Sequence, residues 1–287
     1  MAHASESPEW TTGRASERGH WYNLLTGELV YEIRGVNGRM RSPNLRDAKK
    51  FLELGSLILG PGITTVTKQL AAPQLERWKR KQVCMSARTL PGIELLTDED
   101  ELFAAVEEDA NEQARKAAAR GTVIHAAIQG SFEGMPISAD DMPYVSPARS
   151  WLLQRYGLCG WEAEKSFASP LGFGSKADLR NPSIPCIVDF KGKDLAMMKD
   201  KYTGDTLPGN RLAFWEHCMQ LAATREALGW PRADCVNIFF CRDTPNIPVI
   251  AREWDEAELQ KGWRMFKHCL GLWQEEKDYY PHLRLAA

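Results

Sequence analysis

The sequence lacks the features that would place it in a membrane or a disulfide scaffold. No apolar run reaches the ~18–20 residues of a membrane-spanning helix, and residues 1–20 contain no apolar segment typical of a secretory signal. The seven cysteines are scattered without a Cys-x-x-Cys pair, which disfavours a disulfide framework, a zinc ribbon and an iron–sulfur cluster. We therefore expect a cytoplasmic protein with no membrane partner.

The sequence also lacks an excess of positive charge. Its formal net charge is −2, so no overall basic field indicates a nucleic-acid partner. An enzyme can nevertheless confine its basic residues to one groove beside acidic metal ligands. With 287 residues, 44% of them hydrophobic, and no internal repeat, the sequence predicts one large domain at residues 57–287 after an N-terminal extension at residues 1–56.

Apolar periodicity and turn residues predict the order of elements. A short hairpin is expected at residues 20–34 around Thr26-Gly27, then a loop at residues 35–48, and Thr64 and Thr65 are expected to cap a helix. This order predicts an α/β (α+β) fold, with a central mixed β-sheet flanked by helices and an N-terminal helical extension. The remaining helices are expected at residues 73–88, 98–132, from Ser146-Pro147 to about Gly157, 211–228 and 255–277, and the strands at residues 161–168, 176–180, 186–191 and 235–241.

Two carboxylates in neighbouring predicted strands carry the strongest chemical signal. Strand alternation places Asp189 and Lys191 on one face of a strand that is apolar on both sides, CIVDF. A lone carboxylate buried there is costly unless a cation neutralises it. Asp178, from the preceding strand, can reach the same cation, and carboxylate oxygens favour Mg²⁺ or Mn²⁺. The alternative is an ordinary Asp–Lys pair on a half-exposed strand.

Three further side chains extend this candidate site. Lys191 can orient a nucleophilic water and offset negative charge in a transition state. His125 lies on a predicted helix just after Gly121, which permits close backbone approach, and it is either a satisfied core histidine or a third metal ligand. Gln220 lines up with His217 and Thr224 at helical spacing, and this stripe is either a solvated face or a face turned toward the site and DNA.

The order of these motifs resembles a known nuclease family. GTVIHAAIQ, Glu164, GSKADL, IVDFKGK and HCMQLAATREAL resemble, in that order, the RecB-like branch of the PD-(D/E)XK nucleases. Residues 63–82 also resemble the upstream block of phage-type and mitochondrial genome maintenance-type exonucleases. The resemblance covers about residues 57–240. It implies a restriction-endonuclease-like core and a Mg²⁺-dependent deoxyribonuclease that leaves 5′-phosphates.

The resemblance also implies roles for individual residues. The histidine and the two aspartates would bind Mg²⁺ (or Mn²⁺), with the carbonyl of Phe190 as a further ligand, while the lysine would be catalytic and the glutamine would lie beside the site. Thr224 departs from the pattern, because the family often has an aromatic residue there. The five catalytic positions implied are His125, Asp178, Asp189, Lys191 and Gln220.

The resemblance further implies a DNA partner with free ends, single- or double-stranded. Trp78, Lys79, Lys81 and Lys193 are candidate contacts besides Gln220, because cations bind phosphate and aromatic rings stack on bases. The alternative is a solvated charged face. A single-strand annealing protein is a possible further partner. The oligomeric state is left open between a monomer and a ring-forming homo-oligomer.

Three functions remain as alternatives. The first is an exonuclease in phage DNA recombination, repair or processing. The second is an endonuclease of restriction or repair type on the same core. The third is a catalytically silent DNA-binding recombination partner, which the intact set of Asp178, Asp189 and Lys191 disfavours.

Overall fold

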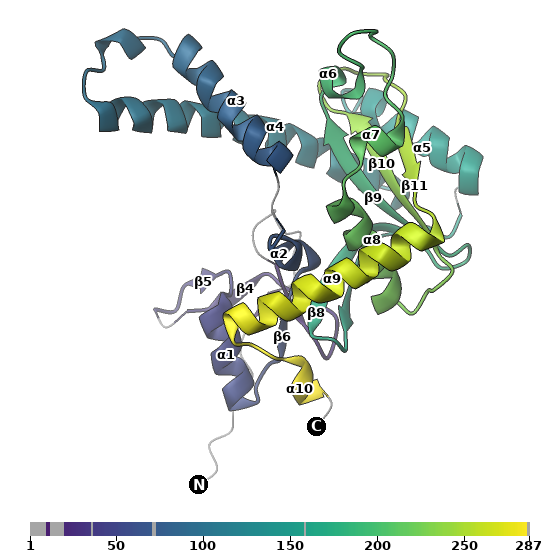
Figure 1. The fold of residues 1–287 in the computed structure, drawn as a ribbon. Helices are drawn as coiled ribbons and strands as arrows, with labels where there is room; N and C mark the ends of the chain where they lie inside the picture. Colours follow the sequence, from purple (N-terminus) through teal and green to yellow (C-terminus); the bar gives the residue numbers. More distant parts are fainter. Residues whose placement is uncertain (1–9, 12–19, 36, 71–72, 158, 286–287) are drawn as a thin grey trace.

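A five-stranded mixed sheet forms the centre of the protein. The computed structural model describes residues 10–11, 20–35, 37–70, 73–157 and 159–285 (Figure 1). The sheet has the order β11-β10-β9-β8-β7, in which β9 and β10 are parallel and the other neighbours are antiparallel. This arrangement confirms the expected α+β class with a mixed sheet. The strands are β7 (Glu162–Ser169), β8 (Phe173–Asn181), β9 (Cys186–Lys193), β10 (Asp234–Cys241) and β11 (Ile250–Glu253).

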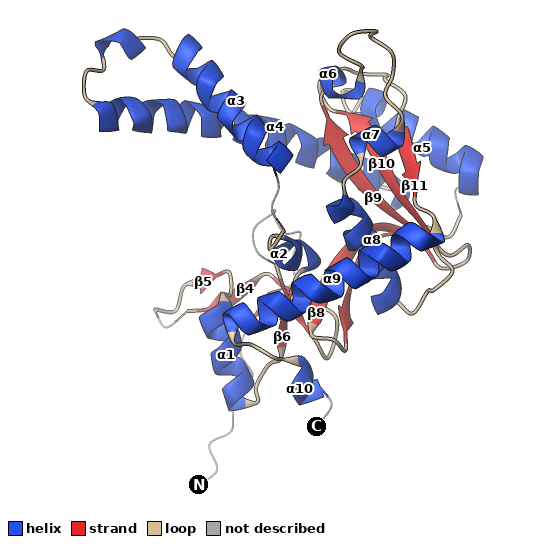
Figure 2. Cartoon of the chain, viewed as in Figure 1, coloured by secondary structure: helices blue, strands red, loops and turns tan. Residues whose placement is uncertain are grey.

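Helices cover both faces of this sheet (Figure 2). On one face, α4 (Glu99–Phe132) and α5 (Met142–Tyr156) share an apolar cluster with β8, β9 and β10. On the other face, α8 (Trp215–Ala227) and the start of α9 (Glu256–Lys277) share a second cluster with β8, β9 and β10. Both sides of the central strands are therefore dry, which explains why CIVDF and CVNIFFC are nearly continuous apolar runs.

The N-terminal part is built from short strands and one helix. β2 (Trp21–Asn23) pairs with β3 (Leu29–Val30) and with β6 (Leu59–Pro61), which confirms the expected hairpin. A second small sheet has the order β1-β4-β5, and α1 lies between it and β6 in the chain. The remaining bounds here are β1 (Trp10–Thr11), β4 (Glu32–Arg34), β5 (Met40–Arg41), α1 (Leu45–Leu54) and α2 (Ile63–Thr67).

The N-terminal part and helix α9 share one core. Trp21 packs against Trp273 and Tyr279, with ring centroids 6.3 Å and 6.1 Å away. The hydroxyl of Tyr279 donates to the carbonyl of Leu59 at 2.7 Å, across 220 residues of sequence. Residues 20–66 therefore pack on the main body through α9 rather than forming a separate core.

A helical arm projects from this body (Figure 1). It consists of α3 (Pro73–Thr89), the short helix η1 (Ile93–Leu95) and α4 as far as Gly121, and we call residues 73–121 the arm. The hydroxyl of Ser86 donates to Asp109 at 2.6 Å between its two helices. The rest of α4 continues onto the sheet. Three short helices complete the fold: α6 (Leu195–Met198), α7 (Gly209–Leu212) and α10 (His282–Leu285).

The predicted helix starts were partly wrong near the N-terminus. The expected loop at residues 35–48 is interrupted at Leu45 by α1, because Asn44 and Asp47 form a capping box that satisfies the first backbone N–H groups. Thr64 and Thr65 lie inside α2 rather than capping it. The residue before α2 is Gly62, which has no side chain to act as a cap.

Two further helices differ from expectation for identifiable reasons. α5 begins at Met142, so Pro147 lies inside it. Because Pro147 has no N–H, it cannot donate to the carbonyl of Pro143 one turn earlier. That carbonyl instead accepts the N–H of Asn246 at 3.0 Å. The expected helix at residues 211–228 is broken at Ala213, because this residue and the next adopt extended backbone angles between α7 and α8.

Other sequence expectations have simple outcomes. α3, α4, α9 and β10 agree with their predicted ranges to within a residue or so. Among the described residues, no helix combines the length and apolarity that crossing a bilayer requires. All seven cysteines are free thiols. Residues 1–9 and 12–19, where the sequence shows no secretory signal, lie outside the described residues.

Candidate active site

The candidate site lies where β8 and β9 separate. Their backbone pairing runs from Asn181↔Cys186 to Leu179↔Val188, and one step further stand Asp178 and Asp189. There the carboxylate of Asp178, rather than the backbone, accepts the N–H of Phe190 at 2.8 Å. The expected placement of the two aspartates on paired neighbouring strands is therefore confirmed.

Asp189 is almost completely enclosed. Its side chain is 5% exposed, and it accepts hydrogen bonds from Lys191 Nζ at 2.9 Å and from Asn237 Nδ2 at 2.6 Å. Burial raises the pKa of Asp189, the charge of Asp178 raises it further, and Lys191 opposes the rise. One nearby ammonium therefore does not fully compensate the desolvation of this carboxylate.

Asp178 is held by groups from the other face of the sheet. α4 brings His125 Nε2 to 2.9 Å from Asp178 Oδ2, and the ring of His125 meets the ring of Phe190 edge-on. Burial by itself raises the pKa of Asp178, but His125, Lys191 and the amide of Phe190 outweigh it and leave that pKa below its ordinary value. For His125, burial lowers the pKa, and Asp178 outweighs that effect and raises it overall. Asp178 is therefore the more acidic of the two aspartates.

Lys191 joins the strand pair to α8. Its ammonium donates to Asp189 and also to Gln220 Oε1 at 3.2 Å. The stripe with His217 and Thr224 therefore faces the sheet, and the solvated-face alternative is wrong. Thr224 is 3% exposed and donates its hydroxyl to the Gln220 carbonyl at 2.8 Å, while His217 packs on the ring of Phe239.

The five expected catalytic positions thus gather into two adjoining hydrogen-bonded chains. One runs from His125 through Asp178 to the amide of Phe190. The other runs from Asp189 through Lys191 to Gln220. They meet in β9, where the residues at positions 189, 190 and 191 are consecutive. The explanation for Gly121 was wrong, however, because a Cβ atom built there would meet nothing within 4 Å.

The expected DNA contacts lie at varying distances from this centre. Trp78, Lys79 and Lys81 belong to α3 in the arm, where Lys79 pairs with Glu76 at 2.8 Å. Lys193, at the end of β9, lies over the rings of Phe214 and Phe239. Burial, together with Lys191 and Arg242, lowers the pKa of Lys193 to about 8.

Glu164 lies on β7, the strand that pairs with β8. It forms an ion pair with Lys176 on β8, and its φ of 56° is unusual for a residue with a side chain. Its partner Lys176 occupies the strand position two residues before Asp178.

Two site residues were not foreseen from the sequence. Asn237, on β10, donates to Asp189 and accepts the indole N–H of Trp254 at 2.7 Å. Gln129, one turn after His125, donates to the Asp178 carbonyl at 3.4 Å. A lone amide in the apolar run CVNIFFC was an available signal, because a buried amide requires partners.

The expected three-ligand metal site of His125, Asp178 and Asp189 stays a prediction. Among the described residues, no group of three or more His, Cys, Asp or Glu side chains is arranged to hold a metal ion. His125 instead bonds directly to Asp178. Two carboxylates nevertheless suffice for Mg²⁺, which is commonly bound by one or two carboxylates and water. The buried, undercompensated carboxylate of Asp189 fits such a cation.

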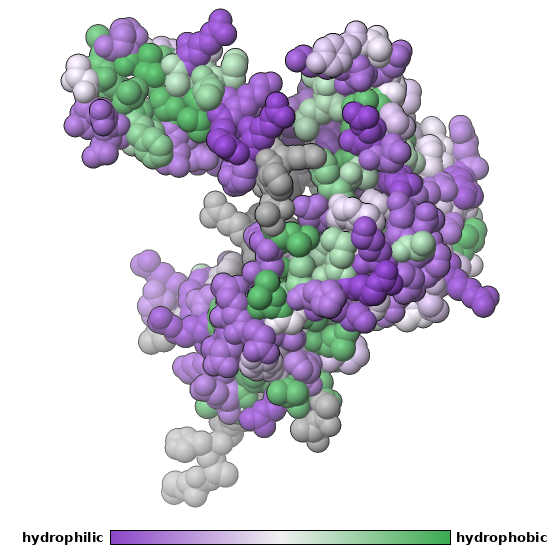
Figure 3. All heavy atoms as spheres, viewed as in Figure 1, coloured by the Kyte–Doolittle hydropathy of each residue, from purple (hydrophilic) through white to green (hydrophobic). Residues whose placement is uncertain are grey.

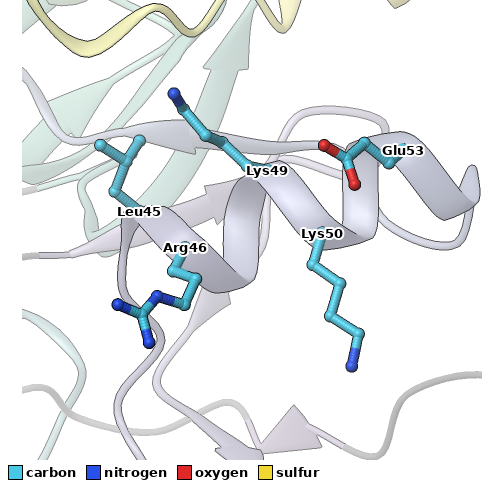
Figure 4. Close-up of a pocket in the computed structure, with 5 residues that line it drawn as sticks. All are labelled: Leu45, Arg46, Lys49, Lys50 and Glu53. Carbon is cyan, nitrogen blue, oxygen red and sulfur yellow. The ribbon is translucent and has the colours of Figure 1, made fainter.

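A hollow lies on the N-terminal part of the molecule, away from these residues. It is shallow and runs along α1, where Leu45, Arg46, Lys49, Lys50 and Glu53 line it (Figure 4). All five side chains come from one helix. The hollow therefore lacks polar groups that converge from separate elements, unlike the site between β8 and β9.

Comparisons with known proteins give little further assignment. No protein-family model matches the chain, and no curated protein matches it. A solved structure described as "Crystal structure of SSO0001" is similar at 14% identity and a TM-score of 0.23, over 45% of this chain and 57% of that chain. The chain therefore spans little more than half of that structure. A TM-score of this size assigns neither a fold family nor a function.

Proposed function

We propose that the chain is a metal-dependent deoxyribonuclease with a PD-(D/E)XK-type core, and that it acts as an exonuclease from free DNA ends. One observation carries the proposal: Asp178 and the Asp189-x-Lys191 pair stand on adjacent antiparallel strands, in contact with His125 and Gln220. The resemblance of the motif order supplies the DNA substrate and the exonuclease mode.

The residues present fit a hard divalent cation. Asp178 and Asp189 would hold Mg²⁺ or Mn²⁺, with His125 and the Phe190 carbonyl as further candidates. When bound, such an ion lowers the pKa of a water and offsets charge on phosphate oxygens. The raised pKa of Asp189 supports this role, because a nearby cation would favour its ionised form.

The protein's own groups have distinct tasks in this proposal. His125 and the Phe190 amide keep Asp178 ionised and fixed in place. Gln220 and Asp189 hold the Lys191 ammonium from two sides, so its charge is already oriented before substrate arrives. Asn237 fixes the remaining oxygen of Asp189. These contacts restrict the two groups that would act on a phosphodiester.

The DNA would be held outside this centre. Lys79, Lys81 and Trp78 on the arm, and Lys193 beside the site, offer cations and an aromatic ring. These contacts would position the backbone without reading sequence, because phosphate groups are the same at every step.

The test uses three DNA substrates with and without Mg²⁺: an end-labelled linear duplex, an end-labelled single strand and a covalently closed circle. The proposal expects cutting of at least one linear substrate and none of the circle. It also expects loss of activity in EDTA and in Asp189→Asn and Lys191→Ala. Lys165→Ala is the matched control, because Lys165 is an exposed lysine on neighbouring β7.

The outcomes separate the alternatives. Cutting of the closed circle would contradict the exonuclease and favour the endonuclease. Full activity in Asp189→Asn would contradict the assigned centre. Mg²⁺-independent DNA binding without any cutting would favour the silent recombination partner.

A further inference from the structure

The arm carries opposite charges at its two ends. The Ser86–Asp109 contact fixes the register of α3 on α4, so residues 82–112 form its outer half, and residues 73–81 with 113–121 form its root. The outer half has nine acidic residues and one basic residue, Arg88, a net charge of −8. The root has seven basic residues and one acidic residue, Glu76, a net charge of +6.

The ion pairs within the arm do not cancel this separation. Arg115 bonds Glu108, and Lys116 bonds Glu112, across the boundary between the halves. All four side chains in these pairs are more than half exposed. Exposed pairs of this kind contribute little, so they can exchange for contacts with another molecule.

The arm also leaves apolar side chains uncovered. Val106 and Ala110 are buried between its helices, but Val83, Met85, Leu95 and Phe103 are 37%, 41%, 78% and 63% exposed. In Figure 3 hydrophobic residues gather over the outer part of the arm, while its root is mostly hydrophilic. Two helices alone cannot enclose a core, so these side chains would be covered by a second layer.

We propose that this second layer is the arm of another copy of the same chain, packed antiparallel so that each acidic outer half lies on the partner's basic root. A two-fold axis makes such a contact self-complementary, because each junction occurs twice. A parallel arrangement would instead place like charges together. Each arm thus offers its partner an acidic outer half for the partner's basic root and a basic root for the partner's acidic outer half.

The dimensions indicate a reversible dimer. From Glu99 to Gly121 the helix spans about 34 Å, and two helices are about 20 Å wide, a footprint of about 700 Å² per chain. That is just below the ~800 Å² per partner of a standard interface. A dissociation constant in the micromolar range is therefore expected, and it should weaken by about tenfold or more between low and high salt.

The test is a charge-swap experiment on the full chain. An outer-half variant carries Lys at Glu101, Glu107, Glu108 and Glu112, which brings that half to neutral; all four side chains are exposed. A root variant carries Glu at Arg77, Arg80, Arg115 and Lys116, which brings the root to −2; these are exposed too. A control variant carries Glu at three exposed cations of the N-terminal part: Arg39, Arg46 and Lys50.

Analytical ultracentrifugation gives the mass of each, and circular dichroism verifies its helix content. The wild type and the control are expected to dimerise within about 1–100 µM, and each arm variant alone is expected to stay monomeric. The mixture of the two arm variants is expected to form a heterodimer that is weaker than the wild-type dimer. At one junction the root variant's outer half (−8) meets the outer-half variant's root (+6), and the other junction (0 on −2) is close to neutral. Formation of that heterodimer also shows that both variants are folded.

Three results would overturn the proposal: a monomeric wild type at about 100 µM, an arm variant that dimerises like the wild type, or a mixture that remains monomeric. None of them depends on nuclease activity, so the dimer and the proposed metal centre stand or fall separately. The arm contacts to DNA do not, because Lys79 and Lys81 belong to the same root that the partner's outer half would cover.

Discussion

Asn237 offers a sharp test of how the site is held together. It is fully buried in β10, where its amide donates to Asp189 at 2.6 Å and accepts the indole N–H of Trp254 at 2.7 Å. Asn237→Ala would leave both partners without this hydrogen bond. Each buried polar group left without a partner costs about 1–3 kcal/mol, with charged groups at the upper end. We therefore expect a loss of about 3–5 kcal/mol in the free energy of unfolding.

A double-mutant cycle isolates the hydrogen bond from the indole. Trp254→Phe removes the N–H donor, so the cost of Asn237→Ala should be about 1 kcal/mol smaller in that background than in the wild type. Urea unfolding in EDTA measures all four corners of the cycle. Costs that add to within about 0.3 kcal/mol would refute the reasoning.

Asn237→Ala should also raise the Mg²⁺ concentration that nuclease activity requires. Without the Asn237 amide the Asp189 carboxylate is less stabilised, so the Mg²⁺ concentration for half-maximal nuclease activity should rise about 10–100-fold. Asn181→Ala is the matched control, because Asn181 is a fully buried amide in β8 whose hydrogen-bond partners are the Cys159 carbonyl and the N–H groups of Ser183 and Ile184, not Asp189. It should lower stability and leave the Mg²⁺ demand unchanged, and an equal rise in both variants would contradict a specific role for Asn237.

Three further predictions follow from other parts of the structure. Gly174→Val should cost more than about 3 kcal/mol, because a Cβ there meets Tyr22 Cβ at 2.4 Å. Gly121→Ala should instead stabilise by about 0.5–1 kcal/mol, since nothing lies within 4 Å of its Cβ in α4, and thermal unfolding of both variants checks the contrast. Burial, with Lys191 and Lys193, lowers the pKa of His217 to about 2, so the unfolded chain takes up a proton below about pH 6.5 that the folded chain does not. Stability should therefore fall by about 2 kcal/mol from pH 6.5 to pH 5, and His217→Gln should abolish that part of the fall in urea titrations. Replacing Lys79 and Lys81 by Ala should weaken DNA binding equally at all sequences. The slope of log affinity against log salt concentration should become shallower by about 1 for each phosphate that these lysines neutralise. An unchanged slope would mean that the two lysines do not contact DNA.

The sequence predicted best those elements whose signals are local. Helix α9 has the capping pair Asp255 and Glu258 at its start and an apolar stripe along its length, and its limits were predicted nearly to the residue. The three strands from Glu162 to Lys193 were recognised from their period of two. The sequence also placed Asp178 beside Asp189, because two consecutive strands of a hairpin usually pair.

Features that depend on distant partners were missed. From the sequence alone, Pro147 indicates a helix start. It is tolerated inside α5 because the N–H of Asn246, far along the chain, donates to the Pro143 carbonyl that Pro147 leaves without a partner. The sequence assigned Gln220 to a helix but did not show whether its side chain faces solvent or the sheet, because its stripe is polar. The side chain faces the sheet because it accepts a hydrogen bond from Lys191 on β9. Asn237 was overlooked because its two partners lie on other strands and loops, 48 and 17 residues away.

The bond between Tyr279 and Leu59 has a consequence for how the chain is made. The N-terminal strands contribute Trp21 and Leu59 to a core that also needs Phe266 and Trp273 of α9, which come much later in the chain. At about 5–20 residues per second, the 220 residues between these partners take roughly 10–40 s to emerge. During that time the apolar side of the N-terminal sheet lacks the part of its cover that α9 supplies. Nascent chains that stop before α9 should therefore be recognised by chaperones and proteases as unfinished, whereas chains that include α9 can complete this core.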